Sequence, residues 1–402
     1  MMKDPFASHD LATRAIHSGF DPSEQHPSTV PDIVLANSFL AEPGAGFAAN
    51  EIAELDQYVY TRWANPTVRM LERKVAALEG AEDALAFATG MAAITAVLLH
   101  HLSAGDHLIA GEVMYAGASE LMHTMLPRFG VNVSFVDLTD PAAVQAAVQP
   151  RTRLILAETP ANPILSLCDI EALAKIARQA NAILAVDSTF ASPIVTNPIA
   201  LGAHLVIHSL TKYIGGHGDA LGGIVAGKTD AITALRRAEG VHLGGSLGPF
   251  QAWLIARGAA TLPIRMQAHS ESALKVARFL ENHDRVARVL YPGLDSHPQH
   301  ELARRQMRLP SGMLTFRLTD GAKRLKEFAS QLRIFHYAVS LGHSKSLIFY
   351  LPTEDLAAKT FQLTGAARQR YDAYAGEGIF RVSIGLESAD DLCADLQEAL
   401  AS

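Results

Sequence analysis

Short apolar runs alternate with longer helical stretches between residues 84 and 227. The apolar runs cover residues 84–88, 107–110, 131–136, 154–157, 182–186 and 203–207. The helical stretches include 91–102, 116–129 and 170–180. Runs of this length are typical of buried strands, and their alternation with helices indicates βαβ units. The pattern predicts an α/β fold, with a mostly parallel sheet that is covered by helices on both faces.

The region before this pattern is irregular. Prolines and glycines interrupt residues 1–65 and leave little room for long elements, so this segment is predicted to be an N-terminal arm. A helix should begin directly after it, because Asn65 is a good cap and Pro66 suits the first helical position. Gly80 should end this helix.

The pattern of helical and strand segments changes again towards the C-terminus. A long helical stretch, 264–282, is followed by short strands such as 313–318 and helices such as 322–331. We therefore expect a large domain at 66–262 and a smaller α+β domain at 263–402.

The composition of the chain argues against several classes of protein. The hydrophobic residues make up 49% of the 402 positions and the net charge is −7, so a sizeable core is expected and a nucleic-acid footprint is not. Two cysteines give no disulfide framework, and no apolar run reaches the length of a membrane span. The first residues lack the apolar stretch of a signal peptide, and we expect a cytoplasmic protein.

Lys212 and Asp187 each follow an apolar run. Ligands on parallel sheets bind beyond the carboxyl ends of the strands. A lysine and a carboxylate there indicate pyridoxal 5'-phosphate, with Lys212 forming a Schiff base and Asp187 holding the pyridine nitrogen protonated. In the alternative interpretation, Lys212 is simply solvated and Asp187 caps a turn at Ser188 and Thr189.

A phosphate site is predicted from two neighbouring segments. Ser209 and Thr211 flank Lys212 closely and carry hydroxyls that can bind the same phosphate. Gly90 and Met91 begin the helical stretch that follows the first strand, where free backbone N–H groups and the helix dipole favour an anion. The alternative for this second segment is a plain strand-to-helix turn.

Four further residues are weaker candidates. Tyr115 is suited to stacking on a pyridine ring and delivering protons, although it also fits a core aromatic at a helix start. Arg62, close to Tyr60, is apt for a phosphate, and Arg381 for an α-carboxylate. By composition alone these arginines also fit a surface position, an edge strand in the case of Arg381. No metal-ligand motif is present in the sequence.

Taken together, the motifs resemble those of the Cys/Met-metabolism pyridoxal-phosphate enzymes of fold type I. The resemblance runs from residue 60 to the C-terminus. The matching segments are YTRWANPT (60–67), TGMAAI (89–94), ETPANP (158–163), VDSTF (186–190), HSLTKY (208–213), VSLG (339–342) and FRVSIGLE (380–387). They are specific for the family and poorly specific for its individual members.

The resemblance implies a set of roles. Lys212 carries the cofactor, with Tyr115 as a second catalytic residue. Tyr60 and Arg62 hold the phosphate of an adjacent subunit, which implies active sites shared within a dimer and a homotetramer built as a dimer of dimers. The amino-acid substrate is implied to bind at Asn162, Val339, Ser340 and Arg381.

Within the family, the sequence favours a methionine γ-lyase, which converts L-methionine to 2-oxobutanoate, ammonia and methanethiol. Val339 stands where cystathionine γ-lyases typically carry a glutamate. Two departures keep the alternatives open: Gly117 replaces a cysteine, and Lys345 is unusual. The alternatives are cystathionine γ-lyase or γ-synthase, an O-acylhomoserine sulfhydrylase and, from a different class, an inactive cofactor-binding protein.

Overall fold

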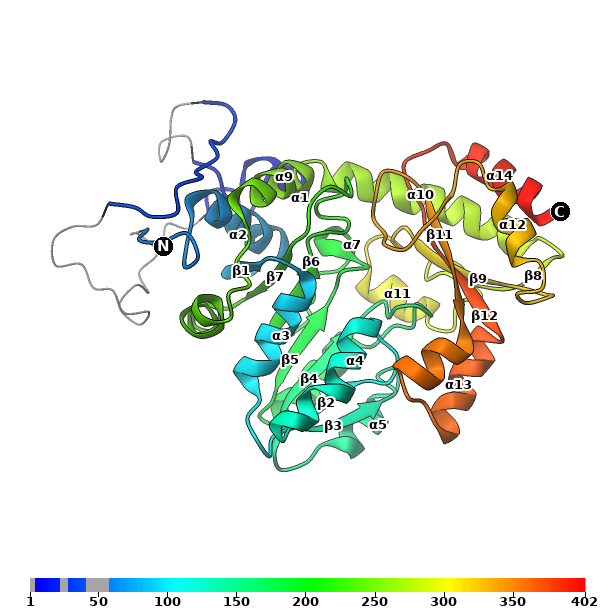
Figure 1. Ribbon diagram of the computed structural model, residues 1–402, viewed down its shortest axis with the longest axis horizontal. Helices are drawn as coiled ribbons and strands as arrows, with labels where there is room; N and C mark the ends of the chain where they lie inside the picture. Colours follow the sequence, from blue (N-terminus) through cyan, green and yellow to red (C-terminus); the bar gives the residue numbers. More distant parts are fainter. Residues whose placement is uncertain (1–3, 22–27, 41–57, 402) are drawn as a thin grey trace.

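Two β-sheets form the framework of the protein (Figure 1). The structure is a computed structural model that describes residues 4–21, 28–40 and 58–401. Parts of the predicted arm, 22–27 and 41–57, lie outside the described residues. The described part of the arm contains one short helix, α1 (Leu11–His17).

The larger sheet has seven strands and is mostly parallel, as the sequence predicts. Its order is β1-β7-β6-β5-β4-β2-β3, and only β7 runs antiparallel to its neighbours. The strands are β1 (Asp83–Phe87), β2 (His107–Gly111), β3 (Asn132–Val136), β4 (Thr152–Glu158), β5 (Ile183–Asp187), β6 (Leu205–Ser209) and β7 (Gly223–Gly227).

Helices cover both faces of this sheet, and strand β4 shows how its side chains divide. Leu154 and Leu156 join the apolar cluster that contains helix α3, whereas Ile155 and Ala157 join the cluster of helix α6. A strand buried on both sides explains the continuous apolar runs in the sequence. The helices are α2 (Pro66–Glu79), α3 (Gly90–His101), α4 (Ala116–Thr124), α5 (Pro141–Ala147), α6 (Ile170–Gln179), α7 (Ser192–Val195), α8 (Thr229–Leu235) and α9 (Pro249–Ala259).

Helix α2 begins and ends as predicted. The Asn65 side chain accepts a hydrogen bond from the Thr67 backbone N–H at 2.9 Å, and Pro66 occupies the first position. Gly80 ends the helix in a left-handed conformation, with φ at 67°. The expected helix at 116–129 is divided, because α4 ends at Thr124 and a 3₁₀ turn, η2 (Leu126–Phe129), follows around Pro127.

The smaller sheet has five strands in the order β10-β11-β12-β9-β8 and is mainly antiparallel. Its strands are β8 (Val286–Leu290), β9 (Met313–Leu318), β10 (His336–Tyr337), β11 (Leu347–Pro352) and β12 (Gly378–Ser383). The helical segments around it are α11 (His300–Gln306), α12 (Leu325–Gln331), α13 (Gly365–Ala375), α14 (Ala389–Ala401) and a π-helical turn, η4 (Asp355–Thr360). The expected helix at 322–331 therefore starts three residues late, at Leu325.

Helix α10 (Leu262–Glu281) joins the two sheets (Figure 1). Its first turns, with Leu262 and Met266, pack in the core that contains α2 and α9. Its later turns, with Val276 and Leu280, pack in the core of the smaller sheet. One continuous helix thus belongs to both cores and fixes the distance between the sheets. The domain boundaries at 65/66 and 262/263 stay a prediction.

Candidate active site

A cavity of about 590 Å³ lies at the carboxyl ends of the parallel strands. Strands β4, β5 and β6 end at it, helices α3 and α4 begin at it, and β12 and the segment 339–341 of the smaller sheet complete it. The predicted site residues that line it are Gly90, Met91, Tyr115, Asn162, Asp187, Ser209, Thr211, Lys212, Val339, Ser340 and Arg381.

Lys212 lies in the turn that follows β6. Its backbone N–H donates to the carbonyl of Ser209 at 3.2 Å, and its Nζ donates to Ser340 Oγ at 3.0 Å. Burial, and then the positive charge of Arg381, lower the pKa of the lysine to about 8. The neutral amine, which is the form that attacks an aldehyde, is therefore accessible near neutral pH.

Asp187 is the last residue of β5. Its Oδ1 accepts a hydrogen bond from the Thr189 backbone N–H at 3.0 Å, so the turn contact of the alternative interpretation is present. The carboxylate nevertheless lines the cavity, and burial raises its pKa. A buried carboxylate of this kind fits a protonated ring nitrogen, because the opposite charge would compensate for the lost solvation.

Glu158, at the end of β4, pairs with Asp187 in the sheet register and was not singled out in the sequence. Its carboxylate accepts hydrogen bonds from the backbone N–H groups of Tyr115 at 2.6 Å and Asn162 at 2.7 Å. Burial, and then the charge of Asp187, raise its pKa to about 8. The signal that identified Asp187, a carboxylate at the end of an apolar run, applies equally to Glu158.

The predicted phosphate residues lie close together. The Thr89 side chain caps α3 by accepting from the Ala92 N–H at 3.0 Å, and the first N–H groups of a helix have no acceptor within it. A Cβ on Gly90 would lie only 3.0 Å from the Cβ of Ser209, so the helix start abuts the end of β6. Thr211 Oγ1 is held by the Gly222 N–H at 3.1 Å. The free N–H groups at the start of α3, with the hydroxyls of Ser209 and Thr211 nearby, fit a phosphate group.

Arg381 lies on β12, which pairs with strands on both sides, so the edge-strand alternative is wrong. Its guanidinium donates to Asn162 Oδ1 at 3.1 Å and to the carbonyl of Ser340 at 3.3 Å. Burial lowers the pKa of Arg381, an ordinary consequence of removing a cation from water. The predicted carboxylate-binding residues are thus in direct contact.

Tyr115 precedes helix α4 and is 43% exposed, so it is not a core aromatic. Burial, and then the charges of Glu158 and Asp187, raise the pKa of its phenol. A Cβ at Gly117 would lie 2.9 Å from the tyrosine ring, so a side chain there would have to displace the ring. Gly117, which stands in place of a cysteine, therefore leaves room for the Tyr115 ring in this conformation.

Tyr60 and Arg62 do not line the cavity. The Arg62 guanidinium lies 5.5 Å from the centre of the Tyr60 ring, and its NH1 donates to the carbonyl of Val241. Within one chain these residues do not join the site, and their predicted role in an adjacent subunit stays a prediction.

The lining of the cavity also includes an apolar wall of four residues: Val339, which is exposed, and Leu351, Leu356 and Phe361. The last three pack in one apolar cluster, and Phe361 is 2% exposed. Thr360 ties this segment to α4, since its Oγ1 donates to Glu120 at 3.2 Å and its carbonyl accepts from Ser119. Of these residues, only Val339 was predicted from the sequence. Lys345 is exposed and does not line the cavity.

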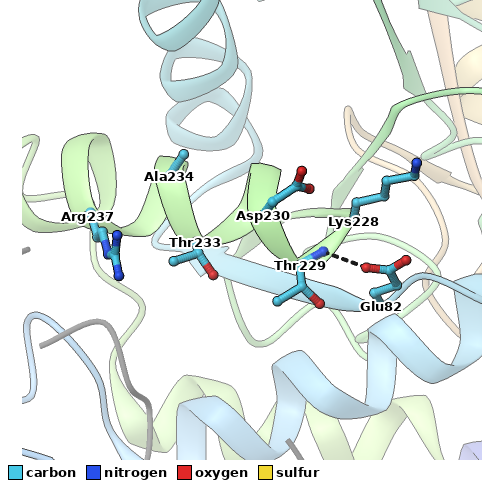
Figure 2. A pocket seen from close by; sticks show the side chains of 7 residues that line it. All are labelled: Glu82, Lys228, Thr229, Asp230, Thr233, Ala234 and Arg237. Atoms are coloured by element: carbon cyan, nitrogen blue, oxygen red, sulfur yellow. Dashed lines mark hydrogen bonds between the residues drawn. The ribbon is translucent and has the colours of Figure 1, made fainter.

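A second hollow, of about 560 Å³, lies along helix α8 and shares no lining residue with this cavity. Figure 2 shows its lining, which includes Glu82 accepting a hydrogen bond from the Thr229 N–H at 2.9 Å. Its remaining charged residues are Lys228, Asp230 and Arg237, and none of the predicted site residues lies there. Among the described residues, no helix is suited to cross a membrane, and no group of three histidine, cysteine, aspartate or glutamate side chains is arranged to hold a metal ion.

Comparison with known proteins gives consistent results. Residues 12–401 match the sequence profile of the Cys/Met metabolism PLP-dependent enzymes. The chain is 40% identical to the canavanine γ-lyase of Rhizobium leguminosarum bv. trifolii over 401 residues (99% of this chain, 98% of the relative). It is 41% identical to the L-methionine γ-lyase of Pseudomonas putida over 396 residues (97% of each chain).

A solved structure extends the comparison to three dimensions. The cystathionine γ-lyase from Lactobacillus plantarum, complexed with L-serine, superposes with a TM-score of 0.87 and 36% identity, over 98% of this chain and 99% of that one. The predicted fold class, cofactor and family are therefore confirmed. The chain belongs to the Cys/Met metabolism family of pyridoxal-phosphate-dependent enzymes.

Proposed function

We propose that the protein catalyses γ-elimination on a sulfur amino acid with an apolar γ-substituent, and that L-methionine is the substrate. The balanced reaction is L-methionine plus water to 2-oxobutanoate, ammonia and methanethiol. The observation that carries this proposal is the apolar wall of Val339, Leu351, Leu356 and Phe361 in a cavity whose only acidic lining residues, within the described part of the chain, are Glu158 and Asp187.

The residues of the chain fit the cofactor. Lys212 would bind it covalently, Asp187 would pair with its ring nitrogen and Tyr115 would stack on the ring. The phosphate would lie at the start of α3, with Gly90, Met91, Ser209 and Thr211 as donors. When bound, pyridoxal phosphate supplies an electron sink for negative charge at the substrate's α carbon.

Arg381 would bind the substrate carboxylate together with Asn162 and Ser340. A guanidinium binds a carboxylate through two parallel hydrogen bonds, which fixes orientation as well as position. In the free protein the Arg381 guanidinium already donates to Asn162 Oδ1 at 3.1 Å and to the Ser340 carbonyl at 3.3 Å, and these two acceptors hold it in place. The site is thus preorganised for an anion.

Proton transfer would use two side chains. Lys212 Nζ, with a pKa of about 8, would take the α-proton and, once it has passed that proton on and is a free amine again, would take a proton from the β carbon. The Tyr115 hydroxyl, whose raised pKa keeps it protonated, would give a proton to the departing thiolate. The thiol leaves with that proton, and hydrolysis releases the keto acid and ammonia.

The apolar wall discriminates between substrates through desolvation. Cystathionine carries a second ammonium and carboxylate on its distal group, and canavanine ends in a guanidinooxy group. A buried charge without a partner is costly, whereas the methyl of methionine needs only apolar contact. Lys345, which would otherwise attract a distal carboxylate, is exposed and away from the cavity.

We also propose that Tyr60 and Arg62 complete the phosphate site of an adjacent subunit within a homotetramer. Support comes from their location in the last residues of the predicted arm, outside the cavity of their own chain. Subunits carrying Arg62→Ala and subunits carrying Lys212→Ala, mixed and allowed to exchange, should regain activity in some dimers. No recovery after proven exchange would contradict shared sites. The cytoplasmic location expected from the sequence stays a prediction.

The test of the function is product identification. Purified protein with pyridoxal phosphate and L-methionine should form 2-oxobutanoate and methanethiol in equal amounts, and Lys212→Ala should form neither. Parallel incubations with cystathionine, cysteine and O-acylhomoserines identify the alternatives. Turnover of an O-acylhomoserine with a thiol, without keto acid from methionine, would contradict the proposal, and no turnover at all would favour the inactive cofactor-binding protein.

A further inference from the structure

His343 is not among the residues that line the cavity, and a single side chain, Ser340, connects it to Lys212. Lys212 Nζ donates to Ser340 Oγ at 3.0 Å, and the same oxygen lies 3.3 Å from His343 Nε2. The three side chains therefore form one continuous hydrogen-bonded chain.

The position of the imidazole is fixed by its surroundings. A Cβ on Gly218, whose φ is 72°, would lie within 3.1 Å of three atoms of the ring, so only glycine leaves room for it there. Gly342, the residue before His343, packs against the backbone that follows Lys212, because a Cβ on Gly342 would lie 2.6 Å from the Tyr213 nitrogen. The Gly342 N–H donates to Ser383 Oγ at 2.8 Å and anchors the loop to β12.

We propose that His343 is a positioning residue that holds the Ser340 hydroxyl as an acceptor towards Lys212. A neutral imidazole whose Nε2 carries no proton accepts a hydrogen bond from the Ser340 hydroxyl. The serine oxygen then only accepts from the lysine, and the lone pair of the neutral amine stays free to attack an aldehyde or to take a proton. Without this acceptor, the Ser340 hydroxyl can donate to that lone pair and block it.

The same arrangement makes the effect sensitive to pH. A protonated imidazole donates from both nitrogens. His343 would then donate to Ser340 Oγ, and the Ser340 hydroxyl would turn to donate a hydrogen bond to Lys212. The charged groups that face His343 are Lys212 from the loop after β6 and Asp219 from the following turn, and Arg381 on β12 acts on the lysine. Burial, and then Lys212, lower the pKa of His343, while Asp219 opposes them, so the neutral imidazole prevails at neutral pH.

This inference rests on the proposed role of Lys212 and holds for any amino-acid substrate. Its test uses the apoprotein and measures the rate at which pyridoxal phosphate becomes attached at Lys212, trapped with borohydride and located by mass spectrometry, between pH 5 and 9. His343→Gln keeps an acceptor that does not titrate, and His343→Leu removes it. Lys345→Gln, an exposed change in the same loop, is the matched control.

At pH 8 the attachment rate should be similar in wild type, His343→Gln and Lys345→Gln, and about tenfold lower in His343→Leu, the loss expected for one hydrogen bond. Below pH 6.5 the wild type and Lys345→Gln should fall more steeply than His343→Gln, by up to about tenfold. In the loaded enzyme, His343→Leu should lower kcat and leave KM nearly unchanged.

Parallel pH curves for wild type and His343→Gln would overturn the role of His343, and this comparison stands even if His343→Leu does not fold. Absence of attachment at Lys212 in the wild type would overturn the proposed function and the inference together. The two failures are therefore distinguishable.

Discussion

Around the cavity, the larger sheet supplies polar side chains at its strand ends, whereas the smaller sheet and its connecting segments supply Ser340 and Arg381 together with an apolar wall. Glu158 and Asp187 end β4 and β5 as paired residues, and Lys212 lies in the turn after β6, so the parallel register of the larger sheet brings them together. The apolar wall comes instead from Val339 and from the segment 351–361, and this segment is held by a contact to α4 and by its own apolar cluster.

The difference indicates a division of labour. A cofactor common to a family requires the same polar groups in the same places, and a regular sheet supplies them with little freedom. Substrate side chains differ between members, and irregular segments tolerate change more readily than strands. The polar side is therefore expected to determine whether the enzyme works, and the apolar side to determine on what.

The largest effect is expected at Lys212. Lys212→Ala removes both the attachment point and the base, and the activity should fall by about a thousandfold or more. The measurement is 2-oxobutanoate formation together with borohydride trapping of the cofactor. Trapping that persists at wild-type levels in the variant would show that another residue carries the cofactor.

A smaller effect is expected at Arg381. Arg381→Leu removes charged hydrogen bonds to the substrate carboxylate and should raise KM by roughly 10- to 100-fold. Arg381→Lys keeps the charge and loses the planar fork, so its KM should lie between those of wild type and Arg381→Leu. The measurement is steady-state kinetics with the same amino acid; an unchanged KM in both variants would place the carboxylate elsewhere.

The smallest effect concerns the stability of the apoprotein. Glu158 has a pKa raised to about 8 by burial and Asp187, so the folded state holds a proton that the unfolded state releases near pH 4.5. Its stabilising contribution is full below pH 4.5 and is lost as the pH rises to 8, with a slope of at most about 1.4 kcal/mol per pH unit.

Denaturant unfolding of apo wild type and Glu158→Gln at several pH values measures this contribution. The variant should lose less stability than wild type between pH 5 and 8. Identical pH dependence in the two proteins would mean that the proton is shared differently with Asp187.

The parts of the protein that follow from local rules could be predicted from the sequence. The strands β1 to β6, helix α2 with its Asn65 cap and the position of Lys212 follow from apolar runs, capping residues and strand ends. Strand β7 was not predicted. It begins and ends with glycine and runs antiparallel to its neighbours. A Cβ at Gly223 would lie 2.1 Å from the Thr89 carbonyl, a long-range contact that no local pattern reveals.

The candidate site divides in the same way. Asp187 was predicted from its strand end, and the same rule would have identified Glu158. Leu356 and Phe361 face the cavity only because η4 packs on α4, a contact between segments far apart in the chain. His343 reaches Lys212 only through Ser340, and nothing in the sequence pattern indicates that contact.

The most direct test of the account is the ratio of kcat/KM for L-methionine to that for L-cystathionine, in wild type and in Val339→Glu, with Val339→Leu as the apolar control. Val339 is 63% exposed, so the expected effect of the substitution is moderate. Wild type and Val339→Leu should prefer methionine by at least about tenfold, and Val339→Glu should narrow or reverse this ratio, because a carboxylate gives the distal ammonium a partner. A wild-type preference for cystathionine that persists unchanged in Val339→Glu would contradict this prediction.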